Sequence, residues 1–260
     1  MKYAYLSETV KVTTVSDGNT KGVFEVEGLY AGYGITIGNA LRRTILSSIP
    51  GAAVTQVKVK GVSHEFSTLP GMAEDVIELC LNFKKVRFRV HTDEPQVLKL
   101  KVKGEREVTA DDIEVNSSVE LINPEAHIAT LTAKGAELDL EVTVEKGLGY
   151  VPVEARKAEK LPVGTIAIDA LFSPARTVNF LVENMRVGES TDYNKVRFEI
   201  ETDGSISPKE MMHKACNILR DHFEKISAIG GALKGKEEAK ESEGEEKETK
   251  KKKKKEKEKE

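Results

Sequence analysis

Apolar and polar residues alternate along several stretches of the chain. A period of two with one polar face is typical of antiparallel strands whose sheet faces solvent on one side. The sequence therefore predicts an α+β fold in which antiparallel sheets dominate and helices are few. The alternating stretches are residues 52–61, 85–91, 96–104, 136–147 and 195–202.

A short helix with two unlike faces is predicted in GYGITIGNALRRTILSSIPG, from Gly32 to Gly51. At about 100° per residue, its two sides carry different types of residue. One side is mainly apolar and would seat the helix, with Ile37, Leu41, Thr44, Ile45 and Ser48. The other side groups Asn39, Arg42, Arg43 and Leu46.

This second side has two interpretations. Arginine offers forked hydrogen bonding and leucine offers area to bury, and together they suit an anchor for another protein. Arginine and single leucine residues are also common on solvated surfaces. The residue pattern leaves both interpretations open.

A second helix is predicted over residues 72–83. Its apolar residues share one side at helical spacing, and its acidic residues point away from them. The apolar set is Met72, Val76, Leu79, Cys80 and Phe83, and the acidic set is Glu74, Asp75 and Glu78.

A third helix is predicted to begin at the sequence SPKE. Ser207 is its N-cap, Pro208 takes the first helical position, and Glu210 closes a capping box. Gly230 and Gly231 end the helix, which gives it about 22 residues and a length of roughly 33 Å.

The apolar residues of this third helix cover more than one narrow stripe, so the helix has two surfaces to bury. One surface could pack on a sheet and the other against a second copy of the chain. A helix buried wholly within one chain is the alternative. The set is Met211, Met212, Ala215, Ile218, Leu219, His222, Phe223, Ile226 and Ile229.

The composition is that of a soluble globular protein, with 260 residues, 39% hydrophobic and 32% charged. No run approaches the roughly 18 apolar residues that cross a bilayer. The start, MKYAYLSETV, lacks the apolar core of a signal peptide. We therefore expect a cytoplasmic protein that does not contact a membrane.

The charge pattern changes at Lys234. From there to the end the chain holds 12 Lys and 10 Glu, with Ala239 as its only hydrophobic residue. Such a segment cannot bury enough apolar surface to offset its ordering entropy, which predicts a disordered tail over residues 234–260. The net charge of −3, less the +2 of the tail, leaves −5 on residues 1–233, which argues against a body that grips DNA.

Strong catalytic and metal-binding motifs are missing from the sequence. The five histidines have no metal-ligand spacing, and neither H-E-x-x-H nor G-x-S-x-G occurs. Gly32, Gly34 and Gly38 form a pattern one residue too long for the dinucleotide fingerprint. Cys80 and Cys216 lie among apolar residues and are predicted to be small buried residues. We expect no catalytic residue, no metal and no cofactor.

Four blocks of this sequence resemble the amino-terminal domain of the bacterial RNA polymerase alpha subunit family. The longest block runs from Gly32 to Lys84 and includes GYGITIGNALRRTILSSIPG and VSHEFSTLPGMAEDVIELCLNFK. The others are GYVPVEARK (149–157), IDALFSPARTVNFLVENMRVG (168–188) and TDYNKVRFEIETDGSISPKEMMHKACNIL (191–219). Together the resemblance covers about residues 1–233.

The resemblance implies an assembly scaffold rather than an enzyme in its own right. Two such chains form a homodimer and recruit the beta and beta-prime subunits, which hold the catalytic centre, so DNA is met only through the assembled polymerase. Arg43 and Leu46 match family positions associated with beta binding, with Asn39 and Arg42 beside them, and Lys84 matches a further contact position. The implied dimer surface combines Ile37, Leu41, Ile45, Ile218, Leu219, His222, Phe223 and Ile226.

The resemblance also implies two subdomains. A dimerisation and assembly subdomain would combine residues 1–50 with 171–233, and a mainly-β subdomain would be inserted over residues 51–170. The chain departs from the family where the charged tail takes the place of a helical carboxy-terminal DNA-binding domain. It also departs at Leu148, where the family commonly has Arg. Two other classes of function remain as alternatives, a stand-alone enzyme and a nucleic-acid-binding module.

Overall fold

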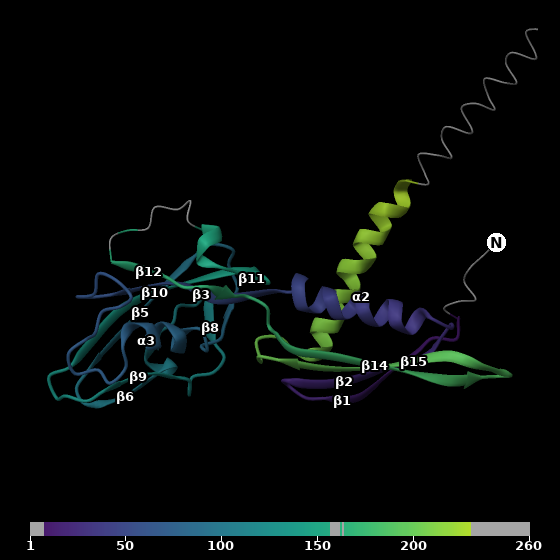
Figure 1. Cartoon of the computed structure of the whole chain (residues 1–260), viewed down its shortest axis with the longest axis horizontal. Coiled ribbons are helices and arrows are strands. Elements are labelled where there is room, and N and C mark those ends of the chain that lie inside the picture. The colour runs from purple at the N-terminus through teal and green to yellow at the C-terminus, as the bar shows by residue number, and fades with distance from the viewer. Residues whose placement is uncertain (1–7, 157–161, 163, 230–260) are drawn as a thin grey trace, which may run out of the picture. The chain divides into compact units, whose positions relative to one another are not determined.

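The computed structural model describes residues 8–156, 162 and 164–229. The strand pairings within this part of the chain are antiparallel, and they build two larger sheets with a few helices (Figure 1). The predicted α+β class is therefore confirmed. The chain divides into two compact units, and the boundary lies between Ala215 and Cys216.

The first sheet joins strands from distant parts of the sequence. Its order is β1 (Lys11–Asp17), β2 (Lys21–Leu29), β15 (Ser190–Thr202) and β14 (Ala175–Val187). Helix α2 (Tyr33–Ser48) lies across one face of this sheet (Figure 1). Phe24, Phe198 and Phe180 are paired across three neighbouring strands, with Phe198 fully buried, so an aromatic row supports the helix.

Ion pairs between neighbouring strands link β2 and β15. The Lys195 Nζ lies 2.7 Å from Glu25 and 3.1 Å from Glu27, and Arg197 lies 3.5 Å from Glu25. Polar residues in these strands alternate with the buried aromatic and aliphatic ones, as a period of two requires.

The second sheet has the order β7 (Ile113–Glu114), β5 (Gln96–Lys103), β10 (Glu137–Leu148), β3 (Pro50–Val59), β4 (Phe88–Val90) and β8 (Val119–Leu121), with β12 (Thr165–Ala167) paired to β3. In β5, Leu98, Leu100 and Val102 are buried, and the lysines between them are exposed. The five alternating stretches of the sequence are thus confirmed as strands β3, β4, β5, β10 and β15.

One short helix, two short strand pairs and two 3-10 turns belong to the same part of the chain as the second sheet. They are α3 (Val76–Phe83), β6 (Arg106–Thr109) paired with β9 (His127–Leu131), β11 (Tyr150–Val151) paired with β13 (Ala170–Leu171), and the 3-10 turns Ala110–Asp112 and Val153–Arg156. The core here draws only on residues between Ala52 and Ile168, with Phe83 and Phe88 among its largest fully buried side chains.

Helix α3 begins four residues later than the predicted helix over 72–83. Asp75 is its N-cap, and its carboxylate accepts a hydrogen bond from the Glu78 N–H at 2.7 Å. Glu74 was expected to point away from the apolar side, but its carboxylate turns to β9, where it accepts the Thr130 N–H at 2.7 Å. The early acidic residues therefore serve as a cap and a strand contact rather than as a solvated helix face.

The third helix spans residues 208–229 of the described chain. The Ser207 hydroxyl accepts the Glu210 N–H at 3.3 Å, which confirms the predicted N-cap. The Glu210 carboxylate is paired with Lys214 at 2.9 Å and makes no hydrogen bond to the Ser207 N–H in the described chain, so the predicted capping box is only half formed. The predicted stop at Gly230 and Gly231, and the tail over 234–260, lie outside the described residues.

Candidate subunit-binding site

The amino-terminal end of α2 is tied to β15 by one buried side chain. Gly32, the N-cap of α2, has φ 83°, a left-handed conformation that glycine adopts without strain. The N–H groups of Gly32 and Gly34 donate to the Asn194 Oδ1 at 2.9 and 3.2 Å. The Asn194 side chain thus satisfies two N–H groups that the helix itself leaves unpaired.

The inner face of α2 approaches the sheet closely because two glycines face it. A Cβ on Gly38 would lie 2.6 Å from the Phe180 ring, and a Cβ on Gly34 would lie 2.7 Å from Val182. The glycine spacing that excluded a dinucleotide fingerprint therefore has a packing role. The buried residues of this face are Gly34, Gly38, Leu41, Thr44 and Ile45.

The outer face of α2 presents the residues expected for beta binding. Asn39, Arg42 and Arg43 are exposed, whereas Leu46 is half-buried, and its carbonyl accepts the Ser173 hydroxyl at 3.2 Å. The Arg42 Nε donates to the Val178 carbonyl at 3.2 Å, which fixes this side chain against β14. Among the described residues, the Arg43 guanidinium has no hydrogen bond or ion pair.

Lys84 lies at the carboxyl end of α3 and is engaged within the chain. Its Nζ lies 3.3 Å from the Asp169 carboxylate, and both side chains are about one-third exposed. Asp169 also accepts the Val153 N–H at 3.0 Å, and this bond, together with Lys84, lowers the pKa of Asp169. Lys84 therefore lies outside α2, and its ion pair with Asp169 holds its side chain.

A groove of 570 Å³ lies beside Lys84, along the outer side of α3. Three apolar side chains of this groove are exposed, with Phe66 at 75%, Leu81 at 51% and Ile77 at 37%. Sequence analysis missed this surface because Ile77 and Leu81, four residues apart, fell outside the apolar side assigned to α3.

Two residues expected at the dimer surface are not available to it. Leu41 is 7% exposed and Ile45 is 0% exposed, because the inner face of α2 packs against the chain's own fold. Their direct role in a dimer contact is therefore withdrawn. Ile37 is half-buried and keeps part of its surface.

The remaining expected dimer residues lie in the helical part of the second unit. Ile218 and Leu219 are half-buried, and His222 is exposed with its Nδ1–H donating to the Ile218 carbonyl at 2.7 Å. Phe223 is 62% exposed and Ile226 is 58% exposed. Among the described residues, this helix therefore carries large apolar side chains that are exposed.

Among the described residues no group of three or more His, Cys, Asp or Glu side chains could hold a metal ion. Cys80 is buried as predicted, and burial raises the pKa of its thiol to about 11, but Cys216 is exposed, contrary to the prediction. In the described chain no helix has the length and apolar character to cross a membrane.

Comparisons with known proteins identify the family. The sequence model named "RNA polymerase Rpb3/RpoA insert domain" matches residues 57–173. The chain is 52% identical over 219 residues to the DNA-directed RNA polymerase subunit alpha of Symbiobacterium thermophilum, covering 84% of this chain and 69% of that protein. The chain is 52% identical to the DNA-directed RNA polymerase subunit alpha of Moorella thermoacetica, over 78% of this chain and 64% of that protein. It is 48% identical to the same subunit of Alkaliphilus oremlandii, over 82% of this chain and 67% of that protein. The chain therefore belongs to the family of DNA-directed RNA polymerase alpha subunits.

Proposed function

We propose that this chain is a non-catalytic assembly subunit of a bacterial DNA-directed RNA polymerase. Two copies form a homodimer, the dimer recruits the beta and beta-prime subunits, and DNA is met only through the assembled enzyme. The observation that carries this proposal is the outer face of α2, where Arg43 projects from a helix whose opposite face is locked onto the sheet.

The packing of α2 supports its use as a binding surface. Asn194 holds its first turn, and the Gly38–Phe180 contact brings its centre close to β14, so the helix is positioned before any partner arrives. A surface that is already ordered loses little entropy on binding. The Arg43 guanidinium, which has no hydrogen-bond or ion-pair partner in the described part of the chain, can offer its forked donors to a carboxylate of the beta subunit, with Leu46 and Asn39 beside it.

Lys84 is proposed as a second contact with the large subunits. Its side chain is about one-third exposed, and its ammonium is paired with Asp169. Exposed ion pairs of this kind contribute little to stability, so an incoming acidic group can share Lys84. The apolar side chains of Phe66 and Leu81 next to it supply area that a partner can bury.

The homodimer is supported by the exposed apolar residues of the helix over 208–229. Phe223, Ile226 and Ile229 are each more than half exposed, and they recur at a spacing of three residues. Large apolar side chains that are exposed together on one helix commonly mark a protein contact. A two-fold contact between two such helices covers the surface on both chains at once.

The division into two subdomains follows as part of the proposal. The first sheet takes its strands from residues 11–29 and 175–202, which belong to the proposed segments 1–50 and 171–233. The second sheet and its core draw on residues that lie within or at the edges of the proposed insert 51–170. The polymerase role places the protein in the cytoplasm.

The experiment that tests the proposal replaces Arg43 by Ala. We expect the variant to fold and dimerise normally, while its affinity for isolated beta subunit falls by about 2 kcal/mol, the scale of an interface hot spot. Leu46→Ala should weaken the same binding. Arg186→Ala, which removes an exposed arginine from β14, is the matched control and should bind beta normally.

Two results would contradict the proposal. Unchanged beta affinity in both Arg43→Ala and Leu46→Ala would show that the outer face of α2 is solvated surface. Nucleotide turnover by the purified chain alone, at a rate that follows its concentration, would show that the chain is an enzyme in its own right.

A further inference from the structure

In the described chain, two connections join the first sheet to the second, and they lie side by side. One runs from the end of α2 into β3 through Gly51, and the other runs from β13 to β14 through Phe172. A Cβ added to Gly51 would collide with the Phe172 carbonyl oxygen, so the two backbones touch. Two adjacent connections leave one axis about which the sheets can turn, which is the geometry of a hinge.

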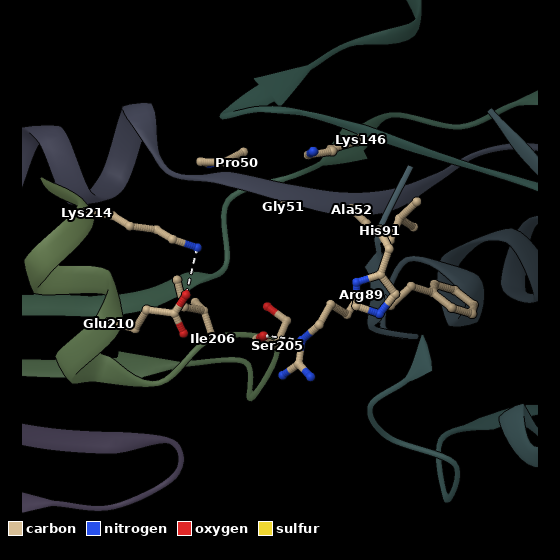
Figure 2. Close-up of a pocket in the computed structure, with 12 residues that line it drawn as sticks. Pro50, Gly51, Ala52, Arg89, His91, Lys146, Ser205, Ile206, Glu210 and Lys214 are labelled. Carbon is tan, nitrogen blue, oxygen red and sulfur yellow. Dashed lines mark hydrogen bonds and ion pairs between the residues drawn. The ribbon is translucent and has the colours of Figure 1, made fainter. Parts of the chain in front are cut away.

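The two sheets have separate apolar cores. The core of the second sheet draws on residues between Ala52 and Ile168, and the buried Phe24 and Phe198 of the first sheet do not belong to it. A cavity of 570 Å³ also lies between the start of β3, β4 and residues 205–214, which follow β15 (Figure 2). Separate cores and a cavity between them are typical of two bodies that can change their relative angle.

Two arginines of the second sheet hold the loop that follows β15. Arg89 lies in β4, and its Nε donates to the Ser205 carbonyl at 2.8 Å (Figure 2). Arg87 lies just before β4, and its Nε lies 3.9 Å from the Asp203 carboxylate. The loop ends at Ser207, the N-cap of the third helix, so these contacts fix the start of that helix against the second sheet.

The Arg87–Asp203 pair is buried but incompletely bonded. The two side chains are 14% and 7% exposed, and the Arg87 Nε has no hydrogen-bond partner in the described chain, although its Nη1 donates to the Leu171 carbonyl at 3.4 Å. Burial lowers the pKa of Arg87, Asp203 opposes this, and Arg176 adds to it. The attraction within a buried pair repays the loss of hydration only when its hydrogen bonds are complete.

Asp203 has partners that do not depend on Arg87. Its Oδ1 accepts the Ser205 N–H at 2.9 Å and the Ser205 hydroxyl at 2.6 Å, and its own N–H donates to the Pro174 carbonyl at 3.0 Å. Separation of the pair therefore leaves the Asp203 carboxylate hydrogen-bonded, while the Arg87 guanidinium gains access to water.

We propose that Arg87 and Asp203 form a releasable latch that controls the angle between the two sheets, with the connections at Gly51 and Phe172 as its hinge. When the latch opens, the loop over residues 203–207 separates from β4 and the sheets turn about the hinge. A partner that contacts both sheets selects one angle by binding it more tightly. The latch is a property of the isolated chain and does not depend on the proposed polymerase role.

The test measures amide hydrogen exchange over residues 203–207 of the full chain, corrected for intrinsic rates. Asp203→Asn removes the charge that faces Arg87 but keeps a side-chain oxygen for Ser205, and we expect at least tenfold faster exchange, because the buried guanidinium is left unpaired. The double variant Arg87→Met and Asp203→Asn removes both charges, and we expect exchange at least threefold slower than in wild type. The matched control, Lys60→Met with Asp139→Asn, removes an exposed ion pair and should leave this exchange unchanged.

Unchanged exchange in Asp203→Asn overturns the latch, and so does a double variant that exchanges as fast as wild type or faster, since the pair would then be an ordinary structural bridge. If Asp203→Asn does not fold, the comparison of the double variant with wild type decides alone.

The angle between the sheets is measured by double electron–electron resonance. Spin labels are attached through Glu183→Cys in β14 and Lys101→Cys in β5, two exposed positions, in a Cys216→Ser chain diluted with unlabelled chain. We expect a broader distribution of distances in Asp203→Asn than in the double variant. Equal distributions would overturn the hinge, because the loop would then open without any turn of the sheets.

Discussion

Asn194 is one of the few polar side chains buried in the described chain, at 7% exposed. Its Oδ1 accepts two N–H groups of the α2 start, and its Nδ2 donates to the Asn184 Oδ1 at 3.3 Å. A buried amide is stable only while its groups remain paired. At the residue scale, this side chain therefore links β15 to the helix that carries the proposed beta contact.

Replacing Asn194 by Ala should leave the Gly32 and Gly34 N–H groups without their acceptor. We expect the free energy of unfolding to fall by about 2 kcal/mol, since each unsatisfied buried group costs about 1–3 kcal/mol. Urea titration followed by circular dichroism measures the change. Asn179→Ala, at an exposed position of β14, is the control and should change stability by less than about 0.5 kcal/mol. An equal loss in both variants would contradict the proposed anchor.

A second residue-scale feature is the cluster of His127 with two carboxylates. The His127 Nε2 lies 2.9 Å from Glu74, and its Nδ1 lies 2.9 Å from Glu107. The Glu74 bond raises the pKa of His127, Glu107 adds to this, and partial burial opposes it. Burial acts to raise the pKa of Glu74, but the Thr130 N–H and His127 outweigh it, so the pKa of Glu74 is lowered.

These opposite shifts set a pH window. Because the folded pKa of His127 exceeds its unfolded value of 6.5, its contribution is complete below pH 6.5 and is lost as the pH rises through the folded pKa. Because the folded pKa of Glu74 lies below its unfolded value of 4.5, its contribution is present above pH 4.5 and is lost as the pH falls through the folded pKa. The cluster stabilises the fold most between these values.

We expect the stability difference between wild type and His127→Gln to be larger at pH 5.5 than at pH 8.5. The His127 side chain is 39% exposed, so solvent screening keeps this pH-dependent difference below about 1 kcal/mol. Urea unfolding at the two pH values measures it. A difference that grows toward pH 8.5 would contradict the assigned pair.

At the element scale, two glycines set how closely α2 approaches the sheet, beside the buried Leu41 and Ile45. Gly34 and Gly38 lie four residues apart, on the face that meets Val182 and Phe180. Residues without a Cβ let a helix approach a sheet closely, and a well-packed contact does not tolerate added atoms. The two glycines lower the intrinsic helix propensity of α2, and in return they allow its close contact with β14.

Gly38→Ala should destabilise the protein although alanine is the better helix former. Propensity alone predicts a gain of about 1 kcal/mol, whereas overpacking against Phe180 costs about 1–3 kcal/mol. We expect the cost of overpacking to exceed the gain in helix propensity, and urea unfolding measures the resulting change in the free energy of unfolding. In a Phe180→Ala background the same Gly38→Ala change should become neutral or stabilising. An equal cost in both backgrounds would show that Phe180 does not limit the approach of α2.

At the scale of the whole molecule, the proposed homodimer depends on the helix over 208–229. Its described carboxyl half leaves Phe223, Ile226 and Ile229 exposed. The inner face of α2 cannot share this role through Leu41 and Ile45, which the chain has already buried. The proposed contact is therefore carried mainly by one helix from each chain.

Ile226→Glu should convert the dimer to a monomer, because an unpaired carboxylate would be buried in the contact. Light scattering coupled to size-exclusion chromatography at micromolar concentration measures the mass. Lys225→Glu places the same charge at a polar position of the same helix and should remain dimeric. A wild-type chain that is monomeric at this concentration, or a dimer that persists in Ile226→Glu, would rule out this helix as the contact.

The sequence by itself determined the class of fold and most of its local structure. Alternation located β3, β4, β5, β10 and β15, because the side-chain period of a strand is a local property of the backbone. The Ser207 cap was also readable, since capping depends on residues within one turn. The outward position of Arg43 on α2 followed from helical periodicity alone.

Only the tertiary structure decided which surfaces remain free. Leu41 and Ile45 have the same character as Phe223 and Ile226, yet the first pair is buried and the second is exposed, because burial depends on elements distant in sequence. Strand β14 lacked a clean alternation and was missed, although it pairs along the whole of β15. The roles of Glu74 and Asn194 likewise depend on contacts between distant segments, which local periodicity does not reveal.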